Sequence, residues 1–167
     1  MGDGYEFTCN KCGKKYSVCW GIGFVYPEVF SDTLKAIKKG EYGEEYKKLA
    51  LSENYVAVDA EEYVYSCRKC GSWTTEMGLS LYAPDNVERL KRKRYGIKTV
   101  EEWGEVPYAT DYDFKRDYHL LKRRLHKCSK CGGIMHKASN KEIINLSCPE
   151  CGGEQRDDLS LTIIKWD

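Results

Sequence analysis

The sequence predicts an α+β protein in which short antiparallel β-hairpins are combined with a helical insertion. Three observations lead to this prediction. Four Cys-x-x-Cys-Gly turns are spread along the chain. Extended aromatic stretches flank these turns, as in YEFTCNKCGKKYSVCW, and such stretches are typical of strands. Residues 31–51 instead carry apolar side chains at helical spacing, which indicates a helix between two of the hairpins.

The composition is that of a globular chain without a general bias toward anionic partners. Its 167 residues allow one or two small domains, and its net charge is +1. The first residues lack the basic and apolar regions of a signal peptide, and no apolar run approaches the roughly 20 residues of a membrane helix. We therefore expect no membrane contact and a cytoplasmic location, where thiols stay reduced.

The cysteines follow a pattern that metal binding requires and disulfides do not. Eight of the nine cysteines form four Cys-x-x-Cys pairs, each followed by glycine. A glycine there can take the left-handed conformation that closes a tight turn and aims both sulfurs at one ion. Tetrahedral zinc needs four such ligands, so two zinc ions per chain are predicted. The predicted ligands are Cys9, Cys12, Cys67, Cys70, Cys128, Cys131, Cys148 and Cys151.

The spacing along the chain suggests which pairs share an ion. Sixteen residues separate Cys131 from Cys148, within the usual window of roughly fifteen to twenty for one zinc site. The intervening IMHKA and IINLSC are predicted to form a hairpin around a turn at SNKE. We therefore expect the two C-terminal pairs to share one ion, and the two N-terminal pairs to share the other across 54 residues. Nested or crossed pairing is the alternative, because closing a longer loop costs only slowly more.

This constellation resembles the zinc-ribbon class, including small bacterial zinc-ribbon proteins that often lack an assigned function. The resemblance covers residues 5–20, 62–77 and 125–166, with LSLTIIKW as a plausible third strand. It implies two ribbons with structural zinc in a non-enzymatic protein that acts as a recognition or adaptor module. The expected partner is a protein or a nucleic acid.

The expected domains follow from this resemblance. They are a zinc ribbon at 1–84 with a helical insertion at about 21–61, a basic helix and linker arm at 85–124, and a C-terminal zinc ribbon at 125–167. Ser31 and Gly40 are the candidate caps of the first helix. Asp85 and Glu88 have the spacing of a capping box for a helix over 85–95.

Basic residues concentrate in the middle of the chain. Residues 86–128 hold twelve Lys or Arg and seven Asp or Glu, while residues 41–62 are acidic. A solvated helix face explains this pattern, and a surface for phosphate backbones or an acidic protein is the alternative. The candidate surface comprises Arg89, Lys91, Arg92, Lys93, Arg94, Lys122, Arg123 and Arg124.

No catalytic motif is found in the sequence. Catalytic zinc needs an open coordination position, and two sets of four cysteines leave none. Cys19 in SVCWG is expected to be a small buried apolar residue, with a nucleophilic role as the alternative. His126 and His136 flank the predicted C-terminal site and are alternative ligands.

Iron is the alternative metal. CPECGG resembles half of the metal-binding turns of rubredoxin, and four thiolates also bind iron. The alternative function is therefore electron transfer by a rubredoxin-like iron protein.

Overall fold

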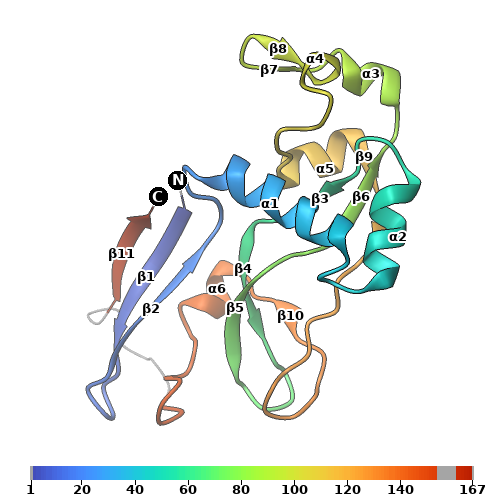
Figure 1. Ribbon diagram of the computed structural model, residues 1–167. Helices are drawn as coiled ribbons and strands as arrows, with labels where there is room; N and C mark the ends of the chain where they lie inside the picture. Colours follow the sequence, from blue (N-terminus) through green and yellow to red (C-terminus); the bar gives the residue numbers. More distant parts are fainter. Residues whose placement is uncertain (1, 154–160, 167) are drawn as a thin grey trace. The chain divides into compact units, whose positions relative to one another are not determined.

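The computed structural model describes residues 2–153 and 161–166, a mixed α and β structure with small antiparallel sheets and six helices in this part of the chain (Figure 1). The chain divides into two compact units. Unit 1 comprises Met1–Phe24, Glu61–Met77 and Leu125–Asp167, and unit 2 comprises Val25–Ala60 and Gly78–Arg124. No helix in the described residues is both long and apolar enough to cross a membrane.

Unit 1 contains two three-stranded antiparallel sheets. In the first, β1 (Gly2–Thr8) lies between β2 (Lys15–Trp20) and β11 (Leu161–Trp166). In the second, β4 (Glu62–Ser66) lies between β5 (Trp73–Met77) and β10 (His136–Lys137). In both sheets the first strand of a hairpin is central and a strand from far along the chain pairs with its free edge.

The two sheets repeat one arrangement. Thr8 pairs with Lys15 next to the turn that begins at Cys9. Ser66 pairs with Trp73 at the equivalent position, next to the turn that begins at Cys67. We call β1, β2 and β11 the outer module, and β4, β5 and β10 the inner module. The inner module lies wholly within the sequence interval between β2 and β11. Beyond the cysteine turns the two hairpins share little sequence, since GDGYEFT and KYSVCW of the outer module correspond to EYVYS and WTTEM of the inner one.

Residues of both modules share one apolar core. Its buried members are Phe7, Val18, Val64, Ile143 and Leu146, each at most 5% exposed. Reciprocal backbone hydrogen bonds also join Gly21, after β2, to Glu62 at the start of β4. The two modules are therefore parts of a single folded unit.

Unit 2 has its own sheet, helices and core. Its sheet has the order β3 (Ala57–Val58), β6 (Leu81–Pro84) and β9 (Tyr118–Lys122), and a small hairpin pairs β7 (Arg94–Tyr95) with β8 (Lys98–Thr99). Its helices are α1 (Tyr26–Lys39), α2 (Glu44–Ser52), α3 (Val87–Lys91), α4 (Val100–Trp103) and α5 (Asp111–Asp117). Fully buried side chains of this unit are Phe30, Ile37, Val58, Leu81 and Val100.

The predicted helices occur with shifted starts. Helix α1 begins at Tyr26 rather than near Ser31, because a proline in its first turn is already set for helical backbone angles. It ends at the predicted cap, Gly40, whose φ is 97°. Helix α3 is capped by Asn86, whose side chain accepts the Arg89 amide hydrogen, rather than by Asp85.

The middle of the chain is folded rather than extended. Residues 98–117, expected as a linker or arm, contain β8, α4 and α5, and each of the two helices begins with a capping box. Val100 and Phe114 are buried in unit 2. The division into two units, each discontinuous in sequence, thus differs from the expected division at 1–84, 85–124 and 125–167.

The predicted C-terminal hairpin is wrong. Only His136–Lys137 of IMHKA forms a strand, and it pairs with β4 instead of with IINLSC. The SNKE segment opens helix α6 (Asn140–Ile143), because Ser139 and Glu142 make a reciprocal capping box. The third strand predicted within LSLTIIKW exists at Leu161–Trp166 but joins the N-terminal strand β1. Residues 159–160 lie outside the described residues.

Candidate metal centres

All four cysteine turns have the same backbone geometry. In each, the amide of the glycine after the second cysteine donates to the carbonyl of the first cysteine at 2.8–2.9 Å. The amide of the first cysteine donates to the backbone carbonyl of the residue that follows this glycine, again at 2.8–2.9 Å. The four glycines have φ values of 67–71°, in the left-handed region. This confirms the turn conformation predicted from the glycine at each position.

The turns combine in nested order. The structure brings Cys9 and Cys12 to Cys148 and Cys151, and Cys67 and Cys70 to Cys128 and Cys131. The predicted pairing of neighbouring turns is therefore wrong, and the nested alternative is correct. The reason is strand pairing. Strand β11 pairs with β1, which brings the turn at 148–153 to the first hairpin. Strand β10 pairs with β4, which brings the turn at 128–133 to the second hairpin. We call the two clusters the outer site and the inner site.

The sulfur atoms have the separation that a tetrahedral metal site requires. Sulfurs about 2.3 Å from a central ion form a tetrahedron with edges of about 3.8 Å. The outer site has Sγ–Sγ distances of 3.6 Å for Cys9–Cys151 and 3.8 Å for Cys12–Cys148. Two such distances in the inner site are both 3.5 Å. A disulfide would need about 2.05 Å, and all nine cysteines are free thiols.

The two sites have the same burial pattern. Going along the chain, the ligands of each site are buried, exposed, buried and half-buried. The first cysteine of every turn is thus in the interior, and the exposed cysteines are Cys12 and Cys70. Each four-cysteine cluster can hold one metal ion near the surface of unit 1.

Local hydrogen bonds favour the thiolate in each site. The pKa of Cys9 is lowered to about 6, chiefly because the Cys12 backbone N–H donates to its sulfur. The pKa of Cys128 is also lowered to about 6, chiefly by the hydroxyl of Ser72, which lies 3.0 Å from its sulfur. The hydroxyl of Ser72 also lowers the pKa of Cys70. The ligand form of cysteine is the thiolate, so these donors prepare one sulfur of the outer site and two of the inner site for a cation.

Neighbouring sulfurs oppose the loss of further protons. At Cys12 the backbone amide of Lys14 lowers the pKa, but burial and the adjacent cysteine sulfurs outweigh it and raise the pKa to about 12. At Cys131 the amide of Gly133 is similarly outweighed, and the pKa rises to about 12. Four negative sulfurs at these distances need a cation among them, so the donor set fits a metal ion that displaces protons as it binds.

A second glycine distinguishes the two kinds of turn. The turns at 128–133 and 148–153 end in Gly-Gly, whereas Lys14 and Ser72 hold the equivalent position in the other two. A Cβ on Gly133 would lie 3.3 Å from Cys131 Sγ and 3.4 Å from Cys67 Sγ, and one on Gly153 would lie 3.3 Å from Cys151 Sγ. Each site thus joins one Gly-Gly turn to one turn without it. This difference is a sequence signal against the pairing of neighbouring turns, and strand pairing then selects the nested over the crossed order.

The remaining candidate residues do not join either cluster. His126 Nδ1 lies 2.7 Å from a Glu76 carboxylate oxygen, and the ring stacks on Tyr65. His136 Nε2 lies 2.8 Å from a Glu142 carboxylate oxygen. Cys19 is half-buried in β2, and burial, together with Glu62, raises the pKa of its thiol.

The predicted basic surface is partly neutralised within unit 2. Four of its members form ion pairs there: Arg89 with Asp117, Lys91 with Glu88, Lys93 with Asp113, and Lys122 with Glu45. Arg92, Arg94, Arg123 and Arg124 are exposed.

Comparison with protein-family models, with the curated proteins and with the solved structures found no significant match.

Proposed function

We propose that the chain is a non-enzymatic zinc protein with two structural zinc-ribbon modules that support macromolecular recognition. The observation that carries the proposal is the pair of four-sulfur clusters, formed by four turns of one geometry with Sγ–Sγ distances of 3.5–3.8 Å. In each module a hairpin supplies one cysteine turn, and a distant segment supplies the second turn and the third strand. This is the arrangement expected of a ribbon closed around a metal.

The donor set favours a structural over a catalytic role. Four thiolates complete the tetrahedral coordination of zinc, which leaves no position for a water or a substrate. Nine free thiols fit a reducing compartment such as the cytoplasm. When bound, zinc would supply the cross-link between distant segments that small sheets need for stability.

Iron electron transfer is the second candidate. Tetrahedral thiolate sites also suit iron. The exposed positions of Cys12 and Cys70 favour this candidate, because electron transfer needs part of the metal site near the surface.

The partner of the zinc protein is proposed to be a protein or a nucleic acid. The exposed arginines of unit 2 at positions 92, 94, 123 and 124 are one candidate contact surface. A partner of complementary charge would be a phosphate backbone or an acidic protein.

The metal content of the purified chain tests this proposal. We expect two zinc ions per chain by elemental analysis, with no absorption in the visible range. Visible charge-transfer absorption with two iron atoms would replace the zinc proposal by electron transfer. Fewer than two metal ions in a folded chain would contradict the assignment of both clusters.

A further inference from the structure

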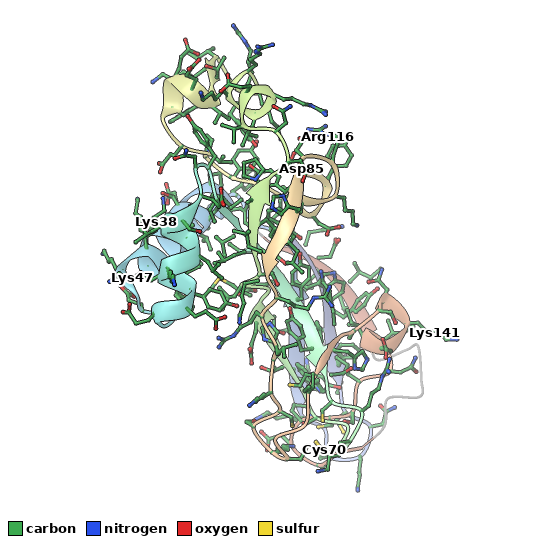
Figure 2. The ribbon with its side chains drawn as sticks, turned by 90° about the vertical axis from the view of Figure 1, so that its right-hand side faces the viewer. Lys38, Lys47, Cys70, Asp85, Arg116 and Lys141 are labelled. Carbon is green, nitrogen blue, oxygen red and sulfur yellow. The ribbon has the colours of Figure 1, made fainter. Side chains whose placement is uncertain are left out.

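A group of cationic side chains lies on the cysteine turns of unit 1. The four turns lie at one end of this unit (Figure 1), and Cys70 marks the same end in Figure 2. The exposed cations on or next to these turns are Lys11, Lys14, Lys15, Arg68, Lys69, Lys127 and Lys130. We call these seven residues the turn cations.

Few carboxylates lie close to the turn cations. Lys14 pairs with Glu150 at 3.3 Å, and both side chains are more than half exposed. Within residues 2–153 and 161–166, no other turn cation has a carboxylate within 4.0 Å. This contrasts with the central basic segment of unit 2, where half of the candidate surface is ion-paired.

Two of these lysines are held in equivalent places. A Cβ built on Gly153 would lie 3.2 Å from Lys11 Cβ, and one built on Gly133 would lie 3.6 Å from Lys69 Cβ. The base of each lysine side chain therefore lies beside the Gly-Gly turn of its own site, while the residue remains exposed. Packing of the stem reduces the conformational entropy that a cation loses on binding an anion.

The turns offer charge without base-stacking groups. No aromatic residue occurs in the turn segments 9–13, 67–71, 128–132 and 148–152. Lysine and arginine ends contact phosphate oxygens, whereas recognition of unpaired bases commonly uses aromatic rings. The chemistry of this surface therefore favours a nucleic-acid backbone, read without regard to sequence.

We propose that the turn cations bind the phosphate backbone of double-stranded nucleic acid. The proposal rests on the proposed function, since only closed metal sites hold the four turns together. It places the interaction surface on the metal-binding turns of unit 1 rather than on the arginines of unit 2. The alternative is that these cations only offset the negative charge of the thiolates, and it predicts no binding of nucleic acid.

Fluorescence anisotropy with a labelled duplex of mixed sequence tests the proposal. The probe is a DNA or RNA duplex of about 20 base pairs, titrated with the metal-loaded full chain at about 50 to 200 mM salt. With about five phosphate contacts, log K should fall linearly with log salt with a slope of about −4.5.

Two triple variants with equal charge change locate the surface. Arg68→Gln/Lys127→Gln/Lys130→Gln should weaken binding at least about tenfold at low salt and make the slope shallower by about 3. Lys38→Gln/Lys39→Gln/Lys48→Gln, at exposed lysines of unit 2 that belong to neither candidate surface, should leave affinity within about twofold.

Metal analysis of the same samples separates the possible failures. Two bound metal ions with no salt-dependent binding would overturn this proposal and leave the zinc-protein proposal intact. An equal loss in the unit 2 variant would also overturn it. Absence of the two metal ions would instead overturn the proposed function.

Discussion

Removal of the metal from both sites unfolds unit 1 while unit 2 stays folded. Unit 1 has two small sheets and two clusters of five buried residues each, one of which includes the metal-site residues Cys67 and Cys128, and β10 is only two residues long. Such small cores supply only a few kcal/mol, whereas a structural zinc site supplies on the order of 10–16 kcal/mol. We expect hydrogen exchange to show loss of amide protection in β1 and β4 after chelation.

Unit 2 is the internal control for this experiment. It has no cysteine of its own, and its buried residues Phe30, Ile37, Leu81 and Val100 form no part of either metal site. Its amides in β6 should keep their protection when the metal is removed. Unchanged protection of β1 and β4 would contradict a structural role for the metal.

Phe7→Ala destabilises the metal-loaded chain by about 3–5 kcal/mol. Phe7 is 1% exposed in the core that joins the outer and inner modules. Its ring stacks on Tyr16 with centroids 5.1 Å apart and meets Tyr5 edge-on at 6.0 Å. Truncation removes these contacts and leaves a cavity. Denaturant unfolding at a fixed zinc concentration, followed by fluorescence, measures the change in free energy.

Phe24→Ala is the matched control for this truncation. Phe24 belongs to the same unit but is 78% exposed, so its loss should change the free energy of unfolding by less than about 0.5 kcal/mol. Equal effects of the two substitutions would show that the core around Phe7 does not hold the two modules together.

The sequence predicted the metal ligands but not their grouping. A Cys-x-x-Cys-Gly turn is a local structure, so the eight candidate ligands could be read from short segments. Grouping depends on which distant strands pair, and the distance between Cys131 and Cys148 along the chain pointed to the wrong answer. The informative residues were Gly133 and Gly153, where an added Cβ would crowd a cysteine sulfur of the same site at 3.3 Å, and these glycines argue against the pairing of neighbouring turns.

For the helices as well, features set by neighbouring residues could be predicted, whereas those that depend on distant contacts could not. Gly40 closes α1 as predicted, because the cap depends on its immediate neighbours. The folded state of residues 98–117 was missed, since it depends on burial of Val100 and Phe114 against distant parts of unit 2. The SNKE segment was misread as a turn although Ser139 and Glu142 carry the capping-box signature.

Metal counts in two double cysteine variants test the central claim of nested sites most directly. Cys12→Ser/Cys151→Ser removes two ligands of the outer site, and Cys12→Ser/Cys70→Ser removes one ligand from each site. All three thiols are exposed or half-buried, so the four fully buried cysteines are kept in both variants.

With nested sites, we expect Cys12→Ser/Cys151→Ser to retain one zinc ion against a competing chelator, because the inner site keeps four thiolates. The second variant should retain neither ion as tightly, because each site is left with three. The reverse result, with one tightly held ion only in Cys12→Ser/Cys70→Ser, would contradict nested pairing and show that neighbouring turns share an ion.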